Sequence, residues 1–111
     1  MKQKRVAAGR PAYRQGDVLV ILRRAGSIPV DAVKLPHCVL AEGEVTGHAH
    51  QIRGPGADLF DKKGKRFLRV IAAQGVSLTH EEHGKQTIPQ GDYEVIIQRE
   101  YEPGGWRNVA D

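Results

Sequence analysis

Hydrophobic residues occur along this chain in short runs that are separated by glycine, proline and charged residues. The segments with a strand-like pattern are residues 17–24, 38–41, 57–61, 66–72, 76–80 and 93–102. The last segment alternates most clearly, with Tyr93, Val95 and Ile97 on one face of a strand and Glu94 and Gln98 on the other. No segment has the sustained spacing of three and four residues that an amphipathic helix requires. The pattern therefore predicts a small, single all-β domain, either a barrel or a sandwich.

Glycine and proline positions predict how these segments are connected. Residues 61–64, with the sequence Asp-Lys-Lys-Gly, are expected to form the turn of a hairpin. Residues 25–36 are expected to form a loop with one helical turn near residues 30–34. The chain then divides into a basic N-terminal arm (residues 1–15), a β domain (16–102) and a C-terminal tail (103–111).

Composition narrows the classes of protein to which the chain can belong. It has 111 residues, of which 40% are hydrophobic and 27% are charged, as expected for one folded domain. The longest aliphatic run, residues 18–22, is far shorter than the roughly 20 residues that cross a membrane. The single cysteine, Cys38, excludes an internal disulfide and is typical of a reducing compartment. We therefore expect a cytoplasmic protein with no membrane-spanning segment.

The formal net charge of +4 is concentrated at one end of the chain. The first 24 residues carry seven lysines and arginines against one aspartate, and the rest of the chain is slightly acidic. A basic arm of this kind suits the phosphates of a nucleic acid, and it equally suits a solvated terminus. No aromatic residues alternate with the basic ones to offer a stacking platform for bases. Nucleic acid is thus a candidate partner, and charge alone leaves both interpretations open.

Four of the five histidines form two close pairs, His48 with His50 and His80 with His83. Residues two apart in a strand project from the same face, so the first pair emerges together. His80 continues the apolar face of its own strand, and His83 joins it only if the chain turns between them. Buried imidazoles need partners, and a divalent metal ion serves several at once. The sequence predicts that these four histidines bind Zn, Fe, Mn or Ni.

Three glutamates are candidates for acid–base chemistry beside such a metal. Glu81 and Glu82 lie between the histidines of the second pair, and Glu94 lies on the last strand. Either Glu81 or Glu82 is alternatively the carboxylate of a site with two histidines and one carboxylate. A metal ion lowers the pKa of its bound water to about 7, which supplies hydroxide at neutral pH. We therefore expect a metal-dependent hydrolase or another metalloenzyme.

Part of this pattern resembles the two sequence motifs of the cupin family. The matching positions are Gly43, His48, His50, Pro89 and Gly91. The resemblance implies a small β-barrel in which histidines and a carboxylate on inward-facing strands hold a divalent metal. The chain departs from the family at residues 52–55, which lack the glutamate of the first motif. It also departs at Glu94, which stands where the second motif has a histidine.

Two other classes of function fit the same residues. One is a metal-independent ribonuclease in which two histidines act as general base and general acid while the basic arm holds the phosphates. The other is a non-enzymatic accessory protein that docks onto a partner, or onto a second copy of itself, through the arm and the tail that contains Trp106. The sequence contains neither a P-loop nor a nucleophile elbow.

Overall fold

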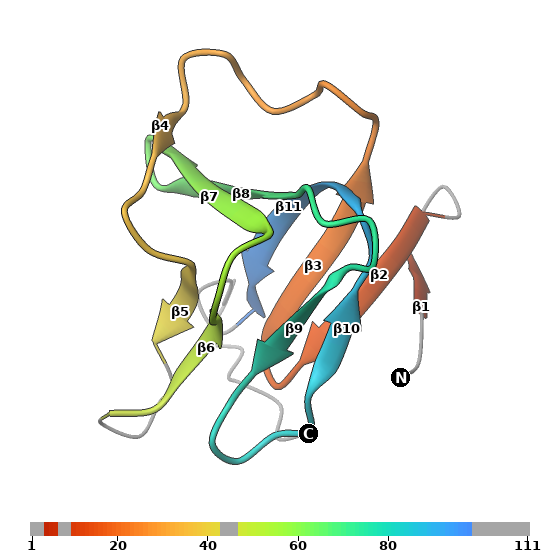
Figure 1. The fold of residues 1–111 in the computed structure, drawn as a ribbon, viewed down its shortest axis with the longest axis vertical. Coiled ribbons are helices and arrows are strands. Elements are labelled where there is room, and N and C mark those ends of the chain that lie inside the picture. Colours follow the sequence, from red (N-terminus) through yellow and green to blue (C-terminus); the bar gives the residue numbers. More distant parts are fainter. Residues whose placement is uncertain (1–3, 7–9, 43–46, 99–111) are drawn as a thin grey trace, which may run out of the picture.

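The strands of this protein form two antiparallel sheets (Figure 1). The computed structural model describes residues 4–6, 10–42 and 47–98. The larger sheet has the strand order β1-β2-β3-β11-β8-β7-β4, and the smaller one has the order β10-β9-β6-β5. The strands are β1 Lys4–Val6, β2 Arg10–Gln15, β3 Val18–Arg23, β4 Val33–Lys34, β5 Val39–Glu42, β6 Ala49–Ile52, β7 Ala57–Lys62, β8 Lys65–Val70, β9 Val76–Thr79, β10 Gln86–Ile88 and β11 Gly91–Ile97. The all-β prediction is confirmed, and the strands do not close into a barrel.

The two sheets share one hydrophobic core. Strand β11 contributes the face that its alternation predicted, with Tyr93 and Val95 buried. The fully buried apolar side chains from the larger sheet include Val18, Val20, Leu59, Leu68 and Val70, and those from the smaller sheet include Leu40, Leu78 and Ile88. Because each sheet buries one face against the other, the arrangement is that of a sandwich. Among the described residues, no helix has the length and apolar character that crossing a membrane requires.

The hairpin of β7 and β8 forms where the glycine of its turn predicted it. Lys63 and Gly64 both have positive φ, 51° and 85°, and these angles match the right-handed twist of the flanking strands. The Gly64 amide donates a hydrogen bond to the Asp61 carboxylate at 3.2 Å. This turn sets a register that pairs Leu59 with Leu68, and both side chains therefore enter the core.

Two parts of the sequence-based layout are corrected by the structure. Residues 10–15 of the predicted arm form β2, which pairs with β3 and buries Tyr13 and Gln15. Residues 33–34 form the short strand β4 beside β7, and the predicted helical turn is confined to residues 29–32, where the Ala32 amide donates a hydrogen bond to the Pro29 oxygen at 3.0 Å. Neither strand has an apolar run of its own, so pairing with a neighbour determines both. The predicted tail, 103–111, lies outside the described residues.

Candidate metal centre

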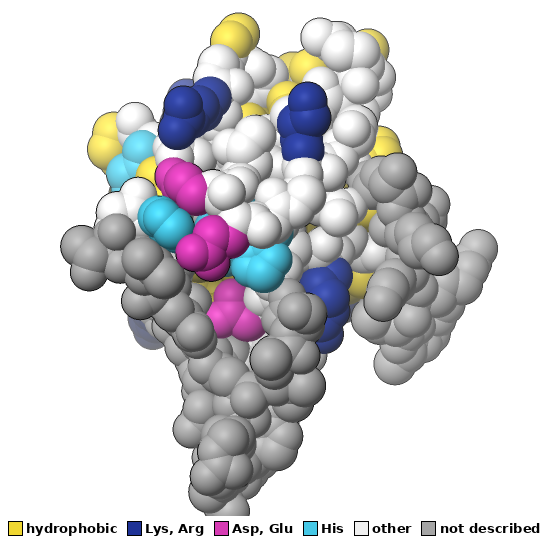
Figure 2. All heavy atoms as spheres, turned by 90° about the horizontal axis from the view of Figure 1, so that it is seen from below, with side chains coloured by type: hydrophobic (Ala, Val, Ile, Leu, Met, Phe, Trp, Pro, Cys, Tyr) yellow, Lys and Arg dark blue, Asp and Glu magenta, His cyan; other side chains and the backbone are white. Residues whose placement is uncertain are grey.

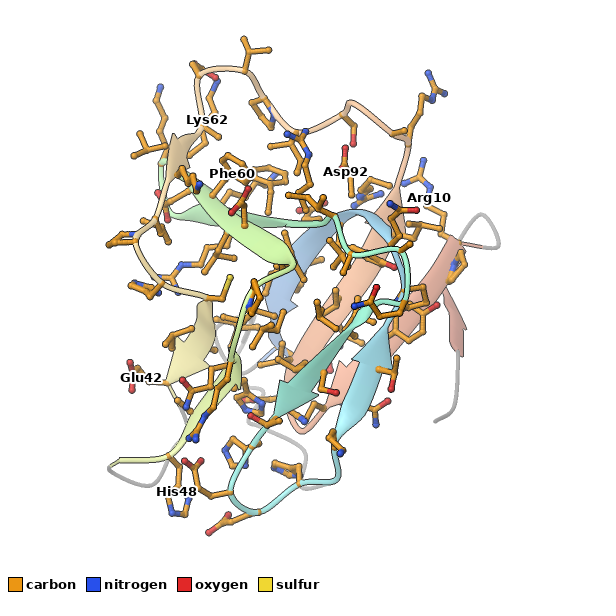
Figure 3. The ribbon with its side chains drawn as sticks, viewed as in Figure 1. Arg10, Glu42, His48, Phe60, Lys62 and Asp92 are labelled. Atoms are coloured by element: carbon orange, nitrogen blue, oxygen red, sulfur yellow. The ribbon has the colours of Figure 1, made fainter. Side chains whose placement is uncertain are left out.

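Three segments that are distant in sequence meet at one end of the sandwich. They are the turn between β2 and β3, the start of β6, and the loop between β9 and β10, all at the bottom of Figure 1. Pairing of β6 with β9 brings the last two segments together, with Gln51 opposite Thr79. Figure 3 shows His48 at this same end. Antiparallel pairing therefore places both histidine pairs side by side.

The rings of all four paired histidines gather around His80. Its ring centroid lies 4.2 Å from that of His50, 4.7 Å from that of His83 and 5.7 Å from that of His48. The chain bends at residues 81–83, which returns His83 to the side of His80. We call these four residues the histidine cluster. Viewed from below, histidine and acidic side chains lie next to one another on this face (Figure 2). The two pairs converge as predicted, but only His50 is buried, and His48, His80 and His83 are partly exposed.

Within this end of the molecule, one group of donor atoms lies close enough to share an ion. Donor atoms of His48, His80 and Glu81 all lie within 4.8 Å of one another. The backbone amide of Ala49 donates a hydrogen bond to Glu81 Oε1 at 3.0 Å, and this bond lowers the pKa of the Glu81 carboxyl. The carboxylate is therefore held in place in its charged form. Two imidazoles and one carboxylate form a donor set that suits Zn or Fe.

The Nδ1 atom of His48 is enclosed without a hydrogen bond to any described residue. It lies 3.5 Å from Glu82 Oε2, and this contact does not have hydrogen-bond geometry. An enclosed polar atom without a partner costs about 1–3 kcal/mol, so native structures retain few of them. A ring nitrogen next to a carboxylate is a position where a cation is stabilised.

His80 has a hydrogen-bond partner within the loop between β9 and β10. The Glu82 backbone amide donates to His80 Nδ1 at 3.0 Å, which leaves the proton of the neutral ring on Nε2. Burial lowers the pKa of His80 below its ordinary value of 6.5, and the nearby His83 lowers it further. The ring is therefore neutral near pH 7, as ligation requires.

This shift in the pKa of His80 predicts a pH dependence of stability for the metal-free protein. Because the folded state binds the proton less readily than the unfolded state, stability is fully present above pH 6.5 and falls as the pH drops below it. We expect His80→Gln to flatten the dependence of the unfolding free energy between pH 7 and about pH 5.5. Urea unfolding in EDTA across this range is the measurement, and parallel curves for the two proteins would contradict the prediction.

His50 is the buried member of the histidine cluster, and Gln15 orients it. The Gln15 Nε2 group donates hydrogen bonds to the backbone oxygens of Leu78 and Gly84, both at 2.9 Å. Its amide oxygen is therefore the atom that faces His50 Nδ1, at 2.9 Å. That oxygen only accepts, so the ring carries a proton on Nδ1 and, when neutral, a lone pair on Nε2.

Asp17 is a site residue that the sequence analysis missed. It lies in the turn between β2 and β3, and its Oδ1 atom is 3.7 Å from His50 Nε2. The sequence signal at this position was a Gly-Asp pair before a β-branched run, which is typical of an ordinary turn. Only the packing of this turn against β6 brings the carboxylate to the histidine.

Gly16, in the same turn, lies directly against His83. A Cβ atom added to Gly16 would lie 2.8 Å from His83 Nε2, and the residue has a φ of +59°. We expect Gly16→Ala to destabilise the protein by about 2–3 kcal/mol, because it adds a clash to the backbone strain of about 1–2 kcal/mol.

The matched control for this substitution is Gly26→Ala. Gly26 has a φ of +83°, but nothing lies within 4 Å of its added Cβ atom. It therefore carries the backbone strain alone, and chemical unfolding of both variants should separate the two contributions. Equal losses of stability would show that the contact with His83 has no energetic role.

Other candidate residues have different surroundings. Glu94 is bound by Arg23, with its second oxygen 3.8 Å from Lys65 Nζ, so its partners belong to the larger sheet. His37 accepts a hydrogen bond from the Val39 amide at 3.1 Å, as expected for a structural residue. Cys38 packs against the core, and burial raises the pKa of its thiol. Glu94 is therefore not part of the group that the fold assembles around His80.

A protein-family model described as a domain of unknown function (DUF8820) matches residues 14–98. The chain belongs to the DUF8820 family. The matched range includes the histidine cluster, Glu81, Glu82 and the turn that carries Gln15 and Asp17. No curated protein and no solved structure matches the chain.

Proposed function

We propose that this protein binds a divalent transition-metal ion through His48, His80 and Glu81. The observation that carries this proposal is the convergence of two imidazoles and one carboxylate, whose donor atoms lie within 4.8 Å of one another. The enclosed nitrogen of His48, which has no hydrogen-bond partner among the described residues, supports it. Zn, Fe, Mn and Ni are the ions that this donor set suits.

Ligation by His80 competes with one hydrogen bond. If Nδ1 binds the metal, the Glu82 amide loses its acceptor; if Nε2 binds it, the ring proton must move to Nδ1, which has the same effect. A hydrogen bond of this kind contributes about 0.5–1.5 kcal/mol. Binding of a structural metal ion contributes on the order of 10 kcal/mol, so ligation is the stronger interaction.

The chemistry that follows from such a site is hydrolysis. Three protein ligands leave a coordination position for water, and a bound metal lowers the pKa of that water to about 7. Glu82 is exposed and its Oε2 atom lies 3.5 Å from His48 Nδ1, so its carboxylate would be the nearest acid–base group outside the ligand set if a metal were bound. We therefore propose a metal-dependent hydrolase, with Glu82 as the acid–base group.

Metal analysis of protein prepared without a histidine tag tests this proposal. We expect at least one equivalent of divalent metal after desalting, and we expect His48→Ala and His80→Ala each to remove one equivalent. His37→Ala is the matched control, because it removes an imidazole outside the histidine cluster and should leave the metal content unchanged. Metal-free wild-type protein after incubation with Zn²⁺, Mn²⁺, Ni²⁺ or anaerobic Fe²⁺ would refute the proposal.

The second candidate function is metal-independent cleavage of RNA. It is favoured by the hydrogen bonds of the two stacked histidines: His50 carries its proton on Nδ1 and His80 carries its proton on Nε2. In such a pair one neutral ring would act as the base, and the other ring, once protonated, would act as the acid. RNA cleavage that persists in EDTA and is lost in His50→Gln would favour this function over the metal site. Salt-dependent binding of RNA by the basic residues near the N-terminus is a further requirement.

A further inference from the structure

We propose that His50 and Asp17 hold a second divalent cation next to the first, so that the site is a two-metal centre. This inference deepens the proposed function and rests on it. It uses Asp17 of the turn between β2 and β3 and His50 of β6, neither of which belongs to the group of His48, His80 and Glu81. The chemical class of the ligand is a divalent transition-metal ion, as at the first position.

Gln15 fixes the orientation of the His50 ring. Gln15 is 2% exposed, and both protons of its amide nitrogen are used by backbone oxygens of the smaller sheet and its loop. The remaining amide oxygen accepts a hydrogen bond from His50 Nδ1. Histidine ligands of metals commonly donate their other ring nitrogen to such an acceptor, which fixes the ring and makes it a better ligand. In His50, this leaves Nε2 as the donor atom for a metal.

The Nε2 atom of His50 faces the carboxylate of Asp17. Asp17 Oδ1 lies 3.7 Å from this nitrogen, and the Asp17 side chain is 16% exposed. Two ligand atoms that each lie about 2.1 Å from one ion are about 3.0–3.4 Å apart at octahedral or tetrahedral angles. A movement of a few tenths of an ångström therefore lets both atoms bind the same ion.

His83 lies next to the turn between β2 and β3. Its ring packs on Gly16, the residue before Asp17, and is inclined by 20° to the ring of His50 at a centroid distance of 5.8 Å. His83 is therefore a neighbour of both His50 and the turn that carries Asp17.

The two positions are neighbours because their histidines are in contact. The ring of His50 stacks on that of His80 at 4.2 Å, and His80 is a ligand of the first position. Paired metal ions in proteins are about 3.5–4 Å apart, and together they bind both oxygens of a reacting group.

Counting the bound metal ions tests the inference. Metal-free protein is saturated with Zn²⁺, desalted and measured by mass spectrometry of the metal, with circular dichroism as the check on folding. We expect two equivalents in the wild type and one equivalent in both Asp17→Asn and His50→Gln. Asp17→Asn is the more secure variant, because Asp17 lies in a turn and His50 is buried in a strand.

Asp31→Asn is the matched control, since it removes an exposed carboxylate that is bonded to Lys62. It should retain two equivalents. One equivalent in the wild type, lost in His48→Ala and retained in Asp17→Asn, would overturn the inference and leave the proposed function intact. No metal in the wild type would refute both.

Discussion

Addition of Zn²⁺ to the metal-free protein is expected to raise the free energy of unfolding by about 4 kcal/mol when the free ion is at about a thousand times its dissociation constant. The reason is that the three ligands come from the start of β6 and from the end of β9, which only the folded sheet brings together. Urea unfolding followed by circular dichroism, with and without EDTA, measures this increment. Equal stability in both conditions would contradict the metal site.

Glu81→Gln should remove at least half of this increment. The new amide oxygen still accepts the hydrogen bond from the Ala49 backbone, but it lacks the negative charge that binds a cation. Glu94→Gln is the matched control, because Glu94 is paired with Arg23 in the larger sheet. That substitution should shift the stability of the metal-free and metal-loaded proteins equally. An increment that survives Glu81→Gln would remove Glu81 from the ligands.

Gln15→Leu is expected to destabilise the metal-free protein by about 3–5 kcal/mol. The substitution leaves the oxygens of Leu78 and Gly84 and the Nδ1 atom of His50 without their partner, and each such group costs about 1–3 kcal/mol. The larger apolar side chain offsets part of this cost. Since small domains are stable by about 5–15 kcal/mol, the loss is a large share of the total. Chemical unfolding in EDTA is the measurement.

Gln86→Leu provides the matched control for this prediction. Gln86 is half-buried on β10, and its side-chain oxygen is buried without a hydrogen-bond partner among the described residues. The same chemical change there removes a polar group that no partner satisfies, so stability should stay within about 0.5 kcal/mol of the wild type or rise. If the two variants lose the same stability, the hydrogen bonds of Gln15 are not what holds this end of the fold.

Much of the fold was predictable because the strongest local patterns also form the centre of each sheet. The segments around Val20, Leu68, Leu78 and Tyr93 all form strands with their apolar residues in the shared core. The sequence pattern did not predict strands β1, β2, β4 and β10. They are short or polar, and each lies beside a strand that supplies its hydrogen bonds.

The candidate site was predicted in part for a similar reason. The spacing of His48 and His50 and the bend after His80 are local features, and the prediction that the two pairs meet is confirmed. The place of Glu94 on the last strand predicts an acid–base residue beside the metal, but in the structure its carboxylate is paired with Arg23 on the neighbouring strand of the larger sheet. Gln15 and Asp17 have no local signal at all, because a glutamine and a Gly-Asp turn are common on any surface.

By itself, the sequence determined that this chain forms strands and that its histidines occur as two pairs. Alternation and turn residues act over a few positions, and they do not depend on the rest of the chain. Only the tertiary structure decided which polar groups face these histidines. Pairing of β6 with β9 brought Glu81 to His48, and packing of the turn between β2 and β3 brought Gln15 and Asp17 to His50. Contacts between segments more than thirty residues apart depend on how strands pair within a sheet and on how the two sheets pack, which no local pattern encodes.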